Sequence, residues 1–286
     1  MANFFATMYV SMSHLALRRH RSARPSPVAI WAWASRNARI VKALLMREVI
    51  TRFGREGLGF AWLIGEPLIF TFGVMTLWSV TKPSYEHGVR LAPFVMTGYL
   101  SIILIRHFIS YLTVALQANV GLLYHRPVKP LHIMSSRILM EFGGATAAYF
   151  VVYMVLVAFG QVDLPHNYLL LYYGWCLLAF LSAGFAMILT GLSMRYDVVE
   201  RITGLVGYLM IPLSGAFAMV AWFPSSVQKY YLMIPFVHCI EMTRAGVFGE
   251  FVPTHYSLLY PLGWAVVFNV IGLLLIATAR DHIESE

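Results

Sequence analysis

The sequence predicts an all-α integral membrane protein with six transmembrane helices, and three observations lead to this fold class. Of the 286 residues, 59% are hydrophobic and only 12% are charged, with a mean hydropathy of +0.69. A soluble domain needs more charge than this to stay dispersed. Apolar runs of about 20 residues, the length that crosses a bilayer core as a helix, recur along the chain. The basic residues lie mainly in the connecting segments that would face one side of the membrane.

Six apolar runs are long enough to be spans. They are Leu58–Val80, Leu91–Leu116, Ser136–Phe159, Tyr168–Ser193, Ile202–Trp222 and Leu258–Ala279. With the N-terminus inside, sixteen Lys and Arg residues lie on the inner side, four lie in outer loops, and Arg106 lies inside a span. Because inner loops of membrane proteins carry the excess of Lys and Arg, we expect both termini in the cytoplasm.

Two segments outside the spans are also predicted to be helical. Arg36, Arg39 and Arg47 share one face of the stretch before the first span, which favours a helix lying in the inner interface. On the outer side, Pro224 and Pro235 mark the starts of two short helices in the segment 223–252. Neither is long enough to cross a bilayer, so we expect a pair of short re-entrant outer helices before the last span.

These segments define the expected domain organisation. Residues 1–27 form a flexible basic tail without a cleavable signal peptide, 28–57 a cytoplasmic interfacial helix, 58–279 the six-span domain, and 280–286 a cytoplasmic tail. Ten of the 21 Lys and Arg residues precede the first span. They favour contact with anionic lipid headgroups, and no nucleic-acid partner is expected. Cys176 and Cys239 lie in a span and in an outer segment, so we expect no structural disulfide.

Five stretches stand out in order along the chain: MREVITRFGREGLGFAWLIGEP (46–67), YHRPVKPL (124–131), MRYDVVER (194–201), PLSGAF (212–217) and IPFVHCIEMTR (234–244). Together they resemble the permeases of type-2 ABC exporters, most closely the capsular polysaccharide export branch (KpsM type). The resemblance covers residues 43–280. The first 30 residues lie outside it.

This resemblance implies a homodimer in the bacterial inner membrane, paired with two copies of a separate ATP-binding subunit. It also implies export of a lipid-linked acidic polysaccharide, which is then passed to a periplasmic polysaccharide co-polymerase. The sequence contains no Gly-x-x-x-x-Gly-Lys-Ser/Thr loop. We therefore expect no cofactor in this chain, with ATP and Mg on the partner ATPase.

Four residues in the first two spans are candidates for the translocation path. Glu66 lies roughly 12 Å into the first span, and an intramembrane carboxylate is a functional candidate by default. Trp62 and Phe70 share its helical face and suit stacking on sugar rings, although packing explains them equally well. Arg106 lies roughly 15 Å into the second span, so an ion pair with Glu66, within one subunit or across the dimer, would relieve both desolvation costs.

Two further sets of residues face the cytoplasm. The resemblance implies that the segment 119–131 forms a short helix and turn that contact the ATPase. The expected coupling residues are Asn119, Tyr124, His125, Arg126 and Lys129. Arg52 and Arg55, at the inner mouth of the first span, are expected to bind either a phosphate on the lipid carrier or lipid headgroups.

No catalytic residues are predicted. His238, Cys239 and Glu241 cannot all meet on one face of a short helix, so we expect no metal site. Three classes of function therefore remain. The first is the capsule exporter, or a close variant that moves O-antigen, teichoic acid or another glycolipid. The second is a membrane-embedded glycosyltransferase, which the short outer loops disfavour, and the third is a channel or scaffold, which would need no docking loop.

Overall fold

The computed structural model describes residues 27–53, 60–83, 85–86, 88–123, 127–249 and 252–283. The chain divides into two compact units, residues 1–40 and 41–286. Helix α2 (Pro27–Phe53) begins in the first unit and ends in the second. The predicted basic tail at 1–27 lies outside the described residues except for its last residue.

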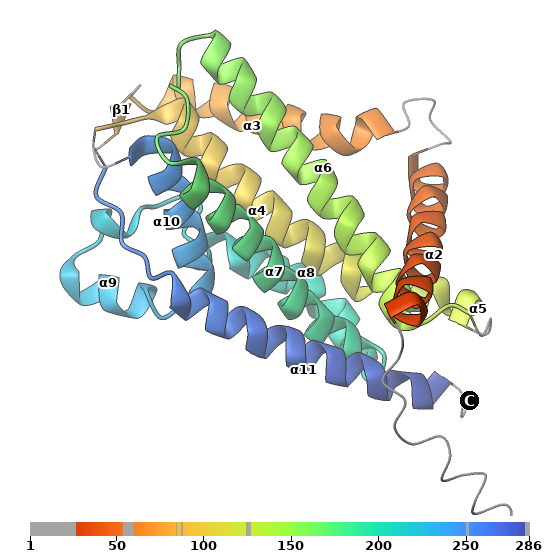
Figure 1. The fold of residues 1–286 in the computed structure, drawn as a ribbon. Helices are drawn as coiled ribbons and strands as arrows, with labels where there is room; N and C mark the ends of the chain where they lie inside the picture. The colour runs from red at the N-terminus through yellow and green to blue at the C-terminus, as the bar shows by residue number, and fades with distance from the viewer. Residues whose placement is uncertain are drawn as a thin grey trace, which may run out of the picture. The chain divides into compact units, whose positions relative to one another are not determined.

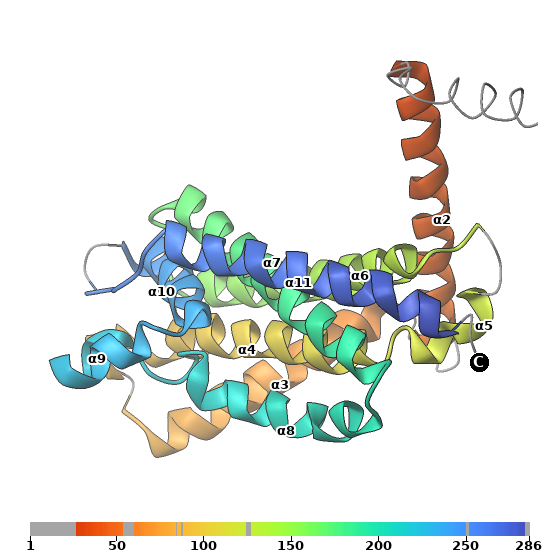
Figure 2. The same ribbon diagram turned by 90° about the horizontal axis from the view of Figure 1, so that it is seen from below.

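The described residues are almost entirely helical, as the sequence predicts (Figures 1 and 2). Five of the described helices are long and apolar enough to cross a membrane. These are α3 (Phe60–Thr81), α4 (Leu91–Thr113), α6 (Pro130–Ala158), α7 (Tyr168–Ser193) and α11 (Leu259–Ile283). A hairpin of two-residue strands, β1 (Tyr85–Glu86) and β2 (Val89–Arg90), joins α3 to α4, with Tyr85 paired to Arg90.

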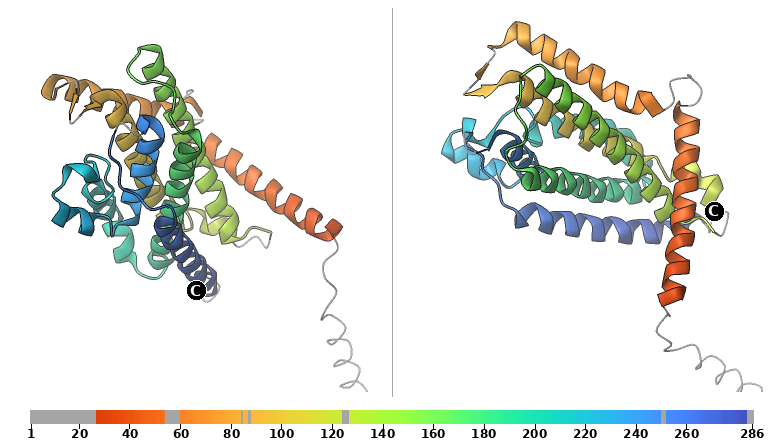
Figure 3. Two further views of the ribbon diagram at one scale, coloured as in Figure 1. Left: turned by 60° about the vertical axis from the view of Figure 1, so that its left-hand side comes forward. Right: turned by 45° about the horizontal axis from the view of Figure 1, so that its top comes forward.

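Helix α4 forms the centre of the second unit and contacts α3, α6, α7, α8 and α10 (Figure 3). Its buried side chains, among them Leu104, Phe108 and Leu112, are fully enclosed and make up much of the core. Helix α11 packs mainly along α7, where Gly184 and Gly272 allow close approach of the two backbones. Most of the outward side chains of α3 and α11 are exposed and apolar, which suits contact with lipid.

The predicted fifth span differs most from the structure. Helix α8 (Asp197–Leu213) has 17 residues, begins five residues earlier than predicted and ends well before Trp222. Gly215 has a φ of 84°, a left-handed conformation that ends the helix. The chain then continues as an irregular segment and a single 3-10 turn, η3 (Val220–Trp222).

The two short outer helices are present at the predicted positions. Helix α9 (Ser225–Tyr231) follows Pro224, and α10 (Pro235–Phe248) begins at Pro235. Proline fits the first turn of a helix because the amide it lacks has no partner there. Helix α10 packs against α7 and is buried along nearly its whole length.

Candidate functional site

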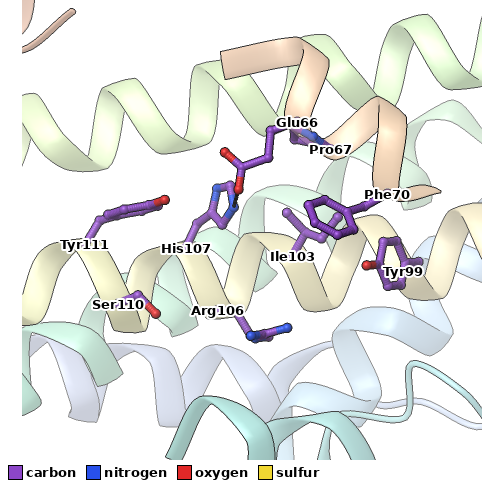
Figure 4. A pocket seen from close by; sticks show the side chains of 9 residues that line it. All are labelled: Glu66, Pro67, Phe70, Tyr99, Ile103, Arg106, His107, Ser110 and Tyr111. Carbon is purple, nitrogen blue, oxygen red and sulfur yellow. Dashed lines mark ion pairs between the residues drawn. The ribbon is translucent and has the colours of Figure 1, made fainter. Parts of the chain in front are cut away.

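A cavity of about 220 Å³ opens between α3 and α4 (Figure 4). Helix α3 contributes a carboxylate, a proline and an aromatic ring, and α4 contributes mostly polar and aromatic side chains. The lining residues are Glu66, Pro67, Phe70, Tyr99, Ile103, Arg106, His107, Ser110 and Tyr111. Three of the four residues predicted for the translocation path therefore meet at one cavity.

Trp62, the fourth predicted residue, does not line this cavity among the described side chains and is 39% exposed. Phe70 lines the cavity and is also partly exposed on the surface of α3. Pro67 follows Glu66 directly, and its carbonyl oxygen accepts a 2.6 Å hydrogen bond from the Thr71 hydroxyl. The carbonyl that loses its donor because Pro67 has no amide hydrogen is that of residue 63, so this bond does not replace the one that proline removes.

The predicted pair between Glu66 and Arg106 is not formed within the subunit. The ion-pair partner of Glu66 among the described residues is His107, whose Nε2 lies 4.0 Å from Oε1 of Glu66. Arg106 points away from Glu66, with its guanidinium 4.9 Å from the centre of the Tyr208 ring on α8 (Figure 4). Consecutive residues of a helix diverge by about 100°, so Arg106 and His107 cannot both face α3.

One end of the second unit carries polar contacts between α2, η2 and α6. Arg47 Nη1 donates a 3.0 Å hydrogen bond to Oδ1 of Asn119 in η2 (Gln117–Asn119). Arg137 and Glu48 form an ion pair of 2.7 Å. The part of α2 within the second unit is thereby attached beside the segment predicted to contact an ATPase.

The structure covers this predicted docking segment only in part. A short helix, α5 (Val120–Leu123), follows η2, and the exposed Lys129 precedes α6. Tyr124, His125 and Arg126 lie outside the described residues. The same holds for Arg55 and for the side chain of Arg52.

Arg244 on α10 lies at the centre of a second polar network, which the sequence did not reveal. The side chain is fully buried, and Nη1 lies 3.5 Å from Oε1 of Glu241. Its guanidinium donates hydrogen bonds to the carbonyl oxygens of Gly215 (2.8 Å), Ala216 (2.6 Å) and Ala218 (3.2 Å). These carbonyls belong to the irregular segment after α8, which is not helical. The arginine therefore supplies the hydrogen-bond donors that backbone amides would supply in a helix.

Neighbouring residues complete this network. Glu241 accepts hydrogen bonds from the amides of Val220 (3.5 Å) and His255 (3.1 Å). Burial raises the pKa of the Glu241 carboxyl and lowers that of Arg244, and each charge opposes the shift of the other. A Cβ at Gly98 of α4 would lie 1.9 Å from the Ala216 oxygen, so only glycine allows this segment to pack there.

The residues considered for a metal site serve other contacts. Nδ1 of His238 accepts a 2.9 Å hydrogen bond from the Ser257 amide, and its Nε2 lies 2.8 Å from the Leu232 oxygen. Cys239 is buried within α10. Within the described part of the chain, no three His, Cys, Asp or Glu side chains are grouped so that they could hold a metal ion.

Comparison with known proteins places this arrangement in context. Residues 39–248 match the family described as ABC-2 type transporter. The capsule polysaccharide export inner-membrane protein CtrC of Neisseria meningitidis serogroup B is 34% identical over 258 residues, which cover 90% of this chain and 97% of CtrC. The corresponding protein BexB of Haemophilus influenzae is 33% identical, covering 87% and 94%. The polysialic acid transport protein KpsM of Escherichia coli is 26% identical, covering 84% and 93%.

Proposed function

The chain belongs to the ABC-2 type transporter family, and on this premise we propose that it is the permease subunit of an ATP-driven exporter of lipid-linked capsular polysaccharide in the bacterial inner membrane. The observation that carries this proposal is the similarity, along nearly the whole chain, to inner-membrane proteins named for capsule polysaccharide export. The chain is a transport component rather than the ATPase.

The proposed assembly contains two copies of this chain and two ATP-binding subunits, which hold ATP and Mg. Family membership and the lack of a phosphate-binding loop in the sequence support separate ATP-binding subunits. A periplasmic polysaccharide co-polymerase would receive the cargo. The segment Asn119–Lys129 is the proposed docking element, because η2 is fixed to α2 through Arg47 and so forms a firm base for a contact.

We assign the translocation path to the cavity between α3 and α4, with Glu66 and Arg106 as its polar residues and Phe70 as an aromatic surface. Trp62 would extend this surface along α3 outside the cavity. Arg52 and Arg55 would attract the phosphate of the lipid carrier at the inner mouth. The residues before α3 would form the basic tail (1–27) and the cytoplasmic interfacial helix (28–57), and 280–286 the cytoplasmic tail.

Six spans with both termini in the cytoplasm remain our proposal for the domain at 58–279. A helix of 17 residues is roughly 25 Å long, which is shorter than a hydrocarbon core of about 30 Å. The fifth crossing would therefore consist of α8 followed by the irregular segment 214–222. Irregular backbone is tolerated at membrane depth where protein groups satisfy it, and Arg244 satisfies three of its carbonyls.

A labelling experiment tests this topology. In a chain lacking Cys176 and Cys239, a cysteine at Glu86, between α3 and α4, should react with a membrane-impermeant maleimide added to intact spheroplasts. A cysteine at His125, between α5 and α6, should react only after the membrane is opened, because an even number of spans separates it from the N-terminus. Labelling of position 125 from outside would contradict the six-span arrangement.

The proposed function is tested with the reconstituted complex. The tagged chain should co-purify with its ATP-binding partner, and capsular glycolipid should raise the ATPase rate of the pair in vesicles several-fold. O-antigen glycolipid serves as the cargo control. Failure of the chain to hold an ATPase would contradict the proposal, and stimulation by O-antigen alone would reassign the cargo. Transfer of sugar from a labelled nucleotide sugar by the chain alone would instead indicate a glycosyltransferase.

A further inference from the structure

His107 lies between two carboxylates that come from different helices. Its Nε2 lies 4.0 Å from Oε1 of Glu66 on α3, and its Nδ1 lies 3.2 Å from Oε2 of Glu141 on α6. The side chains become more buried along this row, from Glu66 at 31% exposed, through His107 at 15%, to Glu141 at 0%. The row therefore leads from the cavity wall into the core of the helix bundle.

Glu141 does not line the cavity, so it cannot touch cargo bound there. An enclosed carboxylate in a membrane span costs much free energy, which indicates that its charge has a use. The imidazole beside it supplies a compensating positive charge when protonated. The His107 ring lies between Glu141 and the cavity, so it can transmit an effect of Glu141 to the cavity wall.

A carboxylate beside one ring nitrogen of a histidine fixes both the tautomer and the ring orientation. With Nδ1 facing Glu141, Nε2 faces Glu66 and the cavity. The ring is also packed edge-on against Tyr111, with their centres 5.3 Å apart. Two independent contacts thus hold the imidazole in place.

We propose that His107 and Glu141 are positioning residues that hold the Glu66 carboxylate at the cavity wall, where it accepts hydrogen bonds from the hydroxyl groups of a sugar residue. This inference rests on the proposed function. Figure 4 shows His107 directed to Glu66, while the Phe70 and Tyr99 rings lie further along the same cavity. A carboxylate next to aromatic rings suits a sugar, whose edge carries hydroxyls and whose faces are apolar.

The test uses the complex of full-length chain and ATPase in vesicles, titrated with capsular glycolipid extracted from the host strain. His107→Gln should raise the glycolipid concentration for half-maximal ATPase stimulation by about tenfold, because Glu66 loses the imidazole nitrogen that faces it. The maximal rate should stay within about twofold. Glu141→Gln should act in the same direction. If Glu141 acts on the cavity through the histidine, as proposed, the double variant should shift the half-maximal concentration no further than His107→Gln alone.

Two control variants distinguish a positioning role from an effect on the stability of the fold. Tyr149→Phe removes a buried hydroxyl on the same helix as Glu141, one that has no hydrogen-bond partner among the described residues, and should leave the titration unchanged. Glu141→Asp keeps the charge and should restore most of the affinity. If Glu141→Gln prevents folding, His107→Gln remains a test because that side chain is partly exposed.

The outcomes separate a failure of the proposed function from a failure of the positioning role. If glycolipid does not stimulate the unmodified complex, the proposed function is wrong. If it does, and His107→Gln leaves the half-maximal concentration unchanged, the positioning role is wrong. A loss of folded protein or of maximal rate without a change in that concentration would also overturn the positioning role, since it indicates a structural contact alone. Additive effects of the two substitutions would show that Glu141 does not act through His107.

Discussion

Arg244→Met is expected to lower the stability of the folded chain by about 3–5 kcal/mol, because it leaves a buried acid without its cation. Glu241 is only 1% exposed, so without this cation it must either carry an uncompensated charge in a dry environment or take up a proton, and both cost free energy. The carbonyls of Gly215, Ala216 and Ala218 would also lose their donor. The irregular segment after α8 should then detach from α10, and little folded protein should be recovered.

The measurement is the fraction of monodisperse protein in detergent and its thermal unfolding temperature. Lys229→Met, which removes an exposed cation from the nearby helix α9, is the matched control and should change neither. Arg244→Met combined with Glu241→Gln should recover part of the loss, since no uncompensated buried charge remains. If Arg244→Met behaves like Lys229→Met, the network does not hold this segment.

The elements that the sequence predicted well carry local signals. Helix α7 spans Tyr168–Ser193, the predicted range, because polar residues border an uninterrupted apolar run and Asn167 caps its start by accepting a hydrogen bond from the Leu170 amide. Helices α9 and α10 begin where Pro224 and Pro235 predict. In these places the local sequence and the packed structure favour the same boundary.

The end of α8 could not be predicted in this way. Hydropathy continues through Trp222, so the apolar run gives no sign that the helix stops at Leu213. The irregular segment that follows the stop at Gly215 depends on Arg244, about 30 residues further on, whose guanidinium donates to three of its carbonyls. The sequence alone counted Arg244 as an ordinary outer-loop cation, because its burial arises only when α10 packs between other helices.

Residue counting predicts the depth of a side chain in a span but not its rotation about the helix axis. Counting residues placed Glu66 and Arg106 at similar heights, and both line the same cavity. Counting cannot tell which side chain of α4 turns toward α3, and that residue is His107. Glu141, which we propose as a positioning residue, was not among the predicted site residues. Its position as an acid within a span was a usable signal, because intramembrane carboxylates are functional candidates by default.

Arg106→Gln is expected to lower the amount of capsular polysaccharide on the cell surface by about tenfold or more. The guanidinium lies inside a span at the cavity wall, and its contact with the Tyr208 ring is of the kind that contributes up to about 2 kcal/mol when water is excluded. Tyr208→Leu should reduce export in the same direction, because it removes the ring face that holds the cation. The double variant should be no worse than Arg106→Gln alone, since the tyrosine acts through the arginine.

A double-mutant cycle that combines Glu66→Gln with Arg106→Gln distinguishes the observed contacts from the predicted Glu66–Arg106 pair. Because Glu66 contacts His107 and Arg106 contacts Tyr208, the effects of Glu66→Gln and Arg106→Gln should add. A double variant better than the sum would instead indicate that the two charges pair across the dimer.

Arg90→Gln, at an exposed arginine next to the start of α4, is the control and should leave export within about twofold. Surface polysaccharide should be measured per amount of chain in the membrane, so that a folding defect is not counted as a transport defect. Undiminished export by Arg106→Gln would remove this arginine from the path.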